Sequence, residues 1–196
     1  MNELLKFDIE YGEIIGVDEA GRGPLAGPVV ASAVIVKNAD KLEGINDSKK
    51  LSEKKREAFF DIIMENCEVG VGIIDEKRID EINILNATFE AMVIALNELN
   101  SDRLVLVDGN QKIKGYEGNQ KTIVKGDAKS LAIASASVIA KVTRDRMMRE
   151  YAKKYPEYSF EKHKGYGTKL HREKLLEIGP CEIHRESFLK KILKRD

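Results

Sequence analysis

An apolar segment that ends in two adjacent carboxylates is the feature that most constrains how this chain folds. Residues 13–18 have the pattern of a short buried strand, and the valine-rich residues 28–36 predict a second strand. The loop between them, residues 19–27, contains three glycines and a proline, which permit tight turns and positive φ. The fold must therefore bury two consecutive strands while it places Asp18 and Glu19 at the end of the first.

The rest of the chain alternates strands and helices. Further strands are predicted at residues 68–74, 103–108 and 121–125. Helices are predicted at residues 52–66 with Ser52 as N-cap, at residues 75–100 with an interruption near 83–86, and from about residue 129 to just before Pro156. The last residues, 157–196, predict a loop followed by one or two basic helices. This order is typical of an α/β fold in which a mixed central sheet is flanked by helices, here with a C-terminal helical extension.

Length and charge indicate one domain with two differently charged parts. The 196 residues suit a single catalytic domain over residues 1–196, with a core of about 1–155 and a basic C-terminal loop and helices of about 156–196. The net charge is zero, yet residues 1–140 carry 17 basic and 24 acidic side chains, and residues 141–196 carry 16 basic and 9 acidic ones. This asymmetry is expected of a protein that binds metal ions with one part and a polyanion with the other. The alternative is a solvated basic helical surface.

Composition argues against several protein classes. The N-terminal residues show no signal peptide, and no apolar run reaches the roughly 18 residues of a membrane span. We therefore expect a cytoplasmic protein without membrane contact. Cys67 and Cys181 form no CxxC pair and are expected to stay reduced. The histidines and cysteines also lack the short spacings of zinc sites.

Acidic residues recur at predicted strand ends. Asp18 and Glu19 end the first strand, and Asp108 and Asp127 end or follow two later ones. Because side chains alternate along a strand, Asp18 and Glu19 are expected to share a site only if one of them lies beyond the regular strand. Clustered carboxylates beyond the strand ends of an α/β sheet select Mg²⁺ or Mn²⁺, and two such ions can clamp a phosphodiester. The alternative is that each residue is an unrelated turn residue.

A dinucleotide-dependent oxidoreductase is a rival interpretation of the glycine loop. The spacing Gly21-x-Gly23-x-x-x-Gly27 has one residue too many before the third glycine. Residues 28–36 also predict a strand, whereas the dinucleotide fingerprint requires a helix there. The loop therefore fails this fingerprint in both spacing and context.

Seven blocks of sequence follow one another along nearly the whole chain. The first is Gly16-Val-Asp-Glu-Ala-Gly-Arg-Gly-Pro-Leu-Ala-Gly-Pro-Val-Val30, and the others are Asp47-Ser-Lys-Lys-Leu-Ser52, Val107-Asp-Gly-Asn110, Lys125-Gly-Asp-Ala-Lys-Ser130, Ala134-Ser-Ala-Ser-Val-Ile-Ala-Lys141, His163-Lys-Gly-Tyr-Gly-Thr168 and His184-Arg-Glu-Ser-Phe188. Together they resemble the type 2 ribonuclease H family, specifically bacterial ribonuclease HII. One departure is Gly179-Pro-Cys-Glu-Ile-His184, where bacterial members commonly have Gly-Pro-Ser-Pro-Ile-His.

The resemblance implies an RNase H-like fold and an endoribonuclease. Such an enzyme hydrolyses the RNA strand of RNA/DNA hybrids by a two-metal-ion mechanism, with Mn²⁺ or Mg²⁺ as cofactor. It also nicks duplex DNA on the 5′ side of a single embedded ribonucleotide, leaving 3′-hydroxyl and 5′-phosphate ends. The family's four metal-binding carboxylates correspond to Asp18, Glu19, Asp108 and Asp127.

The resemblance also implies which residues recognise the ribonucleotide. The family's glycine-arginine-glycine motif contacts the 2′-hydroxyl with backbone groups, and it corresponds to Gly21, Arg22 and Gly23. The family's substrate-sensing tyrosine, which packs against the sugar 3′ of the ribonucleotide, corresponds to Tyr166.

Five further residues are expected to contact nucleic acid. Ser48 and Lys49 are expected to hold backbone phosphates near the cut. Thr143 and Arg144 are expected to face DNA, and His163 to contact a phosphate unless it makes only a structural hydrogen bond. The protein is expected to be a monomer. The alternative function is a binding module that grips hybrids without cutting them, and metal-dependent turnover distinguishes the two.

Overall fold

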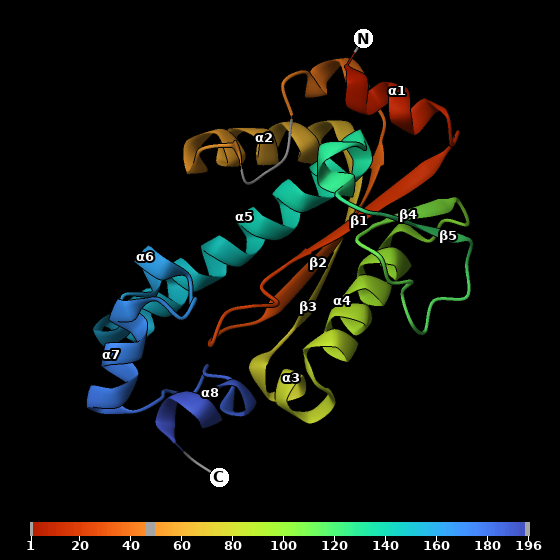
Figure 1. Cartoon of the computed structure of the whole chain (residues 1–196). Helices are drawn as coiled ribbons and strands as arrows, with labels where there is room; N and C mark the ends of the chain where they lie inside the picture. The colour runs from red at the N-terminus through yellow and green to blue at the C-terminus, as the bar shows by residue number, and fades with distance from the viewer. Residues whose placement is uncertain (1, 46–49, 195–196) are drawn as a thin grey trace.

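One mixed sheet of five strands organises the computed structural model, which describes residues 2–45 and 50–194 (Figure 1). The strands are β1 (Ile14–Ala20), β2 (Val29–Val36), β3 (Cys67–Ile74), β4 (Leu104–Asp108) and β5 (Gln120–Ile123). Their order is β3-β2-β1-β4-β5, in which β2 pairs antiparallel with β1 and β3, whereas β4 pairs parallel with β1 and β5. The parallel pairing brings the ends of β1 and β4 to the same edge of the sheet, so Asp18 and Asp108 lie at neighbouring strand ends.

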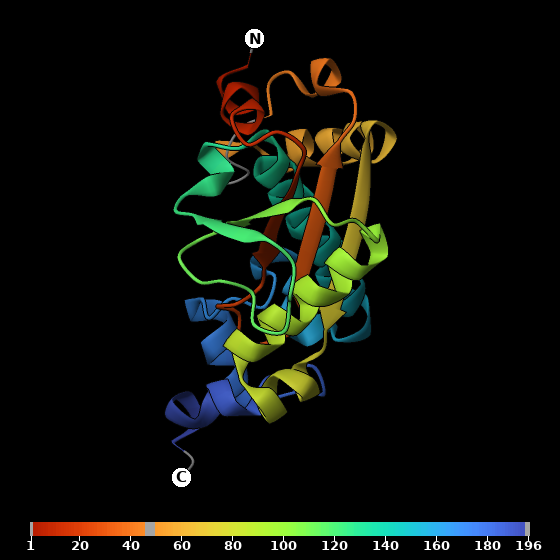
Figure 2. The same cartoon turned by 90° about the vertical axis from the view of Figure 1, so that its right-hand side faces the viewer.

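Helices cover both faces of this sheet (Figure 2). They are α4 (Ile84–Leu99) on one face, and α2 (Glu53–Asn66) and α5 (Leu131–Lys154) on the other. Helix α4 lies directly on β3, because a Cβ at Gly72 would stand only 1.9 Å from the carbonyl oxygen of Ala91. Each face therefore packs into its own apolar layer, and the sheet is held rigidly between two helical layers.

The second half of α5 extends beyond the sheet and carries the C-terminal part of the chain (Figure 1). Three further helices pack there: α6 (Phe160–His163), α7 (Lys169–Ile178) and α8 (Glu186–Leu193). Met148 of α5 shares a buried apolar cluster with Phe160, Leu175 and Leu189 from these helices. The predicted C-terminal helical extension is confirmed. Within the two described ranges, every helix is too short or too polar to cross a membrane.

The structure confirms the kind and order of most predicted elements, with three differences. The C-terminal residues form three helices, α6, α7 and α8, where the sequence predicts one or two. Strand β1 continues to Ala20, so both Asp18 and Glu19 lie inside the strand rather than one beyond it. A short helix that the sequence does not predict, α1 (Glu3–Ile9), precedes β1. The predicted interruption near residues 83–86 is confirmed, since α3 (Glu76–Ile82) ends where α4 begins, at Asn83 with φ +67°.

A buried carboxylate, that of Asp8, connects helix α1 to the first turn of α5. Oδ2 of Asp8 accepts a hydrogen bond of 2.9 Å from the backbone N–H of Ala132, in the first turn of α5. The N-terminal turn of a helix has N–H groups without intrahelical partners, and a carboxylate there satisfies one of them. Burial nevertheless raises the pKa of Asp8 to about 6, because the charged form loses its hydration.

We predict that Asp8→Asn stabilises the protein relative to wild type increasingly as the pH rises. The pKa of Asp8 is higher in the folded chain than in the unfolded chain. The favourable contribution of Asp8 to the free energy of unfolding is therefore fully present below about pH 4 and is lost as the pH rises through 6. The difference in free energy of unfolding between the two proteins should grow by about 2 kcal/mol from pH 4.5 to 7 in urea titrations. Glu10→Gln, at an exposed position in the same segment, is the control. A difference that does not change with pH would contradict this account.

Candidate active site

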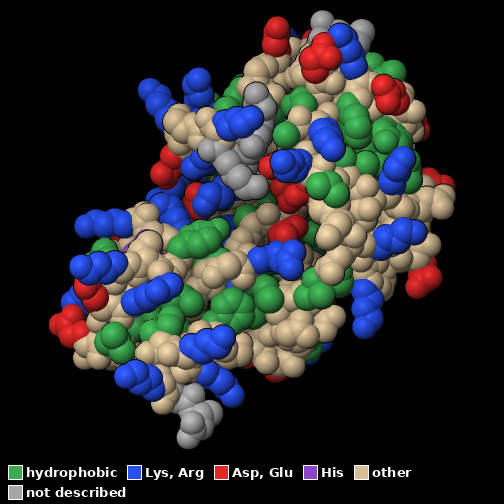
Figure 3. All heavy atoms as spheres, in the orientation of Figure 1, with side chains coloured by type: hydrophobic (Ala, Val, Ile, Leu, Met, Phe, Trp, Pro, Cys, Tyr) green, Lys and Arg blue, Asp and Glu red, His purple; other side chains and the backbone are tan. Residues whose placement is uncertain are grey.

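A hollow of about 280 Å³ opens at the edge of the sheet where β1 ends. Three carboxylates line it, Asp18 and Glu19 from β1 and Asp108 from the end of β4. The other lining residues come from the loop after β1, from α2, from α5 and from the loop before α7, and they are Ala20, Gly21, Arg22, Gly23, Arg56, Ser137, Lys141 and Tyr166. Figure 3 shows acidic side chains in a hollow in the middle of this face, with Lys and Arg side chains around them.

Adjacent residues of one strand reach this hollow from opposite faces of the sheet. Asp18 is hydrogen-bonded to Ser137 of α5, whereas Glu19 also lines a smaller pocket beside Leu85 and Thr88 of α4. The alternation of side chains along β1 is therefore kept. Our expectation that one of the two must lie beyond the strand is wrong, because the hollow spans the edge of the sheet and is open to both faces.

Burial of like charges makes this group of carboxylates electrostatically unfavourable. Desolvation raises the pKa of Asp18 well above its usual range, and the negative charges of Glu19 and Asp108 raise it further. The hydrogen bond from Ser137 offsets only part of this. Desolvation also raises the pKa of Glu19, although Arg22, whose Nη1 lies 3.5 Å from Oε1 of Glu19, opposes it. A cation in the hollow would relieve this repulsion, and hard carboxylate oxygens suit Mg²⁺ or Mn²⁺.

Asp127, the fourth predicted carboxylate, lies beside the hollow but does not line it. It is buried in the 3-10 turn Gly126–Ala128, and the backbone N–H of Gly126 donates a 2.6 Å hydrogen bond to Oδ1 of Asp108. Asp127 is therefore next in sequence to the residue that donates to Asp108. In the part of the chain that the structure describes, no three Asp, Glu, His or Cys side chains stand close enough together to enclose an ion as they are.

The glycine loop and Tyr166 line the hollow together with the carboxylates. Gly21 has φ +97°, and a Cβ there would meet Nε of Arg144 at 2.2 Å, so only glycine fits. A Cβ at Gly23 would instead lie 3.6 Å from the ring of Tyr166, at ordinary contact distance. The Tyr166 side chain is exposed and faces the loop. The predicted loop and tyrosine are thus brought together with three of the four carboxylates.

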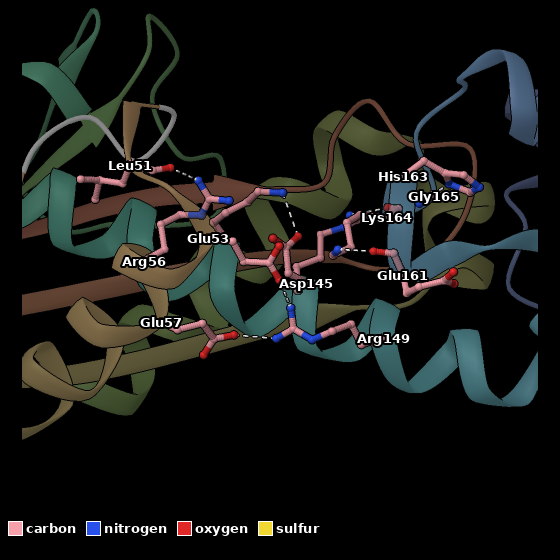
Figure 4. Close-up of polar contacts among 12 residues, drawn as sticks. Leu51, Glu53, Arg56, Glu57, Asp145, Arg149, Glu161, His163, Lys164 and Gly165 are labelled. Carbon is pink, nitrogen blue, oxygen red and sulfur yellow. Dashed lines mark hydrogen bonds and ion pairs between the residues drawn. The ribbon is translucent and has the colours of Figure 1, made fainter.

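The hollow also contains two cations and a serine, Lys141, Arg56 and Ser137, that are not among the predicted site residues. Ser137 and Lys141 lie one turn apart on α5, and Nζ of Lys141 lies 2.8 Å from Oδ1 of Asp145. Arg56 comes from α2 and donates to the carbonyl oxygen of Leu51 (Figure 4). The i, i+4 spacing of Ser137 and Lys141 is the signal that could have indicated a shared face.

Helix α2 is fixed against α5 by ion pairs beside the hollow. Arg149 of α5 contacts Glu53 and Glu57 of α2 (Figure 4). Arg146 of α5 also contacts Glu57. These contacts hold the segment that carries Arg56.

The remaining predicted contact residues have different positions. Arg144 does not face DNA: it is 1% exposed, and its guanidinium donates to backbone carbonyls. The phosphate contact expected of His163 is likewise not supported, since this side chain is buried and hydrogen-bonded to the backbone of Tyr158 and Gly165. Thr143 is half-buried. Ser48 and Lys49 lie outside the described residues.

All three histidines form one buried stack under the Tyr166 loop. The rings of His163 and His171 stack at 4.4 Å, and Nε2 of His171 lies 2.9 Å from Nε2 of His184. Nδ1 of His171 must donate to the carbonyl oxygen of Tyr166, so its Nε2 accepts from His184, whose Nδ1 in turn accepts from the N–H of Cys181. Desolvation lowers the pKa values of His171 and His184 to about 4. The stack is therefore neutral and structural.

Comparison with known proteins decides the family. The sequence model described as ribonuclease HII matches residues 15–191. The chain belongs to the ribonuclease HII family. A ribonuclease HII of Fusobacterium nucleatum is 60% identical over 202 residues, which cover 100% of this chain and 94% of that protein.

Solved structures agree with this assignment. The ribonuclease H2 of Pyrococcus horikoshii is 32% identical with a TM-score of 0.76, covering 93% of this chain and 98% of that one. Bst-RNase HIII, solved in complex with Mn²⁺, has a TM-score of 0.77 at 16% identity, covering 99% of this chain and 72% of that one, and shows the shared fold. The predicted RNase H-like fold is confirmed, and this member of the ribonuclease HII family is a ribonuclease H endonuclease.

We predict that acid weakens the fold through the histidine stack. The pKa values of His171 and His184 are lower in the folded chain than in the unfolded chain. The contribution of these two histidines to the free energy of unfolding is therefore fully present above about pH 6.5 and is lost as the pH falls towards 4. His184→Gln removes one titrating ring, so the loss of unfolding free energy between pH 7 and 5 should be smaller than in wild type by about 2 kcal/mol in urea titrations. Equal losses in both proteins would show that the stack does not control this pH dependence.

Proposed function

We propose that this chain cuts the RNA strand of RNA/DNA hybrids and nicks duplex DNA 5′ of a single embedded ribonucleotide, leaving 3′-hydroxyl and 5′-phosphate ends. The observation that carries the proposal is the hollow in which buried carboxylates face a glycine loop and an exposed tyrosine. The carboxylates provide the chemistry for a phosphodiester, and the loop provides the close backbone approach that a 2′-hydroxyl requires. We also propose that the enzyme acts as a monomer in the cytoplasm.

We assign Mg²⁺ or Mn²⁺ to the carboxylates. Asp18 and Asp127 would hold one ion, and Glu19 and Asp108 would help to hold a second. When bound, the two ions supply an activated water and neutralise charge on the cleaved phosphodiester. The desolvation and mutual repulsion that raise the pKa values of Asp18 and Glu19 support this assignment, because bound cations would remove that cost.

The remaining residues of the hollow hold and check the substrate in this proposal. Backbone groups of Gly21 and Gly23 contact the ribonucleotide, and Tyr166 packs against the next sugar on its 3′ side. Lys141 and Arg56 lie where they would attract backbone phosphates beside the carboxylates. Ser48 and Lys49 are assigned to backbone phosphates near the cut, and the half-buried Thr143 to a contact with DNA.

The first test uses a DNA duplex with one ribonucleotide and an RNA/DNA hybrid, each with Mg²⁺ or Mn²⁺. We expect wild type to nick both, and Asp18→Asn to abolish cleavage while its melting temperature is equal or higher, because one of three mutually repelling charges is removed. Gel electrophoresis of end-labelled substrate and thermal unfolding are the measurements. Binding without turnover by wild type would favour a binding module, and absence of any cleavage would refute the proposal.

The second test uses two glycines that differ in the space around them. Gly23→Ala adds a methyl group that the fold accommodates 3.6 Å from Tyr166, so folding should be unchanged while kcat/KM at a single ribonucleotide falls by about 100-fold, because the backbone can no longer approach the sugar closely. Gly21→Ala is the contrasting variant, since its Cβ would collide with Arg144 at 2.2 Å and should lower the melting temperature. Unchanged cleavage by Gly23→Ala would remove the loop from substrate recognition.

A further inference from the structure

Arg185, a buried arginine of the C-terminal part, binds the backbone of the glycine loop. Its side chain is 0% exposed, although it carries a charge. Nε donates to the carbonyl of Gly27 at 2.9 Å, Nη1 to that of Arg22 at 3.1 Å, and Nη2 to those of Gly21 at 2.6 Å and Pro28 at 3.2 Å. One guanidinium thus fixes carbonyls at both ends of the loop.

Arg144, a second buried arginine, connects the same loop to the segment that carries Tyr166. Its Nε donates to the carbonyl of Pro28, and its Nη2 to that of Ala26, both at 2.9 Å. Its Nη1 donates to the carbonyl of Lys164, also at 2.9 Å, two residues before Tyr166. The arginine pair, Arg144 and Arg185, therefore shares the Pro28 carbonyl and joins two segments of the hollow.

Backbone carbonyls are the direct partners of the arginine pair. In the described part of the chain neither guanidinium forms an ion pair within 4.0 Å of a carboxylate. Desolvation lowers the pKa of Arg185 to about 9 and that of Arg144 to about 10. A charge this costly to bury is compensated here by carbonyl dipoles whose positions match the planar fork of the guanidinium.

The direction of these hydrogen bonds determines where the loop presents its donors. No peptide bond in the described residues is cis, so each carbonyl and the N–H of the same peptide point in opposite directions. Because the carbonyls of Gly21 and Arg22 point to Arg185, the N–H groups of Arg22 and Gly23 point away from it. The loop lines the hollow. Arg185 therefore fixes the orientation of two consecutive backbone donors beside the hollow, the N–H groups of Arg22 and Gly23.

We propose that Arg185, supported by Arg144, is a positioning residue that sets the orientation of the Gly21–Gly23 backbone donors and ties them to the Tyr166 segment. This inference rests on the proposed function for its consequence in catalysis, but the contacts belong to the free protein. The loop is also joined to the same C-terminal segments through its backbone, with hydrogen bonds of 2.8 Å from Leu25 N–H to the Gly165 carbonyl and from Gly27 N–H to the Ile183 carbonyl.

Hydrogen exchange tests the arrangement without substrate. In wild type the amides of Leu25 and Gly27 should be protected to the same degree as those of α8, because both groups open only when the C-terminal part separates from the loop. Arg185→Lys keeps the charge but loses the fork, and it should exchange these two amides at least about tenfold faster. Rapid exchange of both amides in wild type would overturn the proposal even if the variant does not fold.

Kinetics on the ribonucleotide-containing duplex tests the consequence. Arg185→Lys should lower kcat at least about tenfold with less than about a threefold change in KM, because misplaced donors affect the reacting geometry more than duplex binding. Leu189→Ala, which removes apolar packing of the same C-terminal cluster but none of the arginine hydrogen bonds to the loop, is the control for lost stability and should retain kcat at a temperature where it is folded.

The outcomes separate the two proposals. If wild type does not cut any ribonucleotide substrate, the proposed function fails while the exchange result still decides the role of Arg185. If Arg185→Lys is folded and cuts like wild type, or if Leu189→Ala loses as much kcat, Arg185 has no positioning role.

Discussion

Repulsion among carboxylates at the neighbouring ends of β1 and β4 is the constraint on which the rest of this site depends. Asp18, Glu19 and Asp108 are kept close to one another, although burial and mutual repulsion raise the pKa values of the first two. Such an arrangement persists only if the backbone that carries it cannot relax. The sheet meets this requirement, since β1 is paired on both sides and packed between two helical layers.

The glycine loop, which also lines the hollow, is kept in position by other interactions. Leu25 and Ala26 of the glycine loop pack into the apolar cluster of the C-terminal part, and the loop backbone is held by Arg144, Arg185 and hydrogen bonds to the C-terminal segments. His171 of the histidine stack adds a hydrogen bond to the carbonyl oxygen of Tyr166. The site thus combines carboxylates fixed by the sheet with a glycine loop that is hydrogen-bonded to the C-terminal part of the chain.

The sequence could predict the elements but not how they are set against one another. Strand ends, helix caps and the glycine loop are local patterns, and each was recoverable from spacing. The cap of α5 by Asp8 was not, because the two partners are 124 residues apart. Lys141 and Ser137 were missed for a related reason, since the rotation of α5 about its axis is fixed by packing on the sheet. Arg144 was misplaced because an arginine is normally exposed, and only the carbonyls around it make burial tolerable.

These buried arginines also change what the charge asymmetry means. Residues 141–196 carry 16 basic side chains, but Arg144 and Arg185 bind carbonyls, and Arg146 and Arg149 pair with α2. Part of the positive charge therefore builds the fold and is not available to a polyanion. The charges left for a duplex are the exposed lysines and arginines of the C-terminal helices, close to the exposed Tyr166. In this fold the basic end thus divides into two sets: buried guanidiniums hold the glycine loop, and in the proposed function the exposed charges would attract the nucleic-acid backbone.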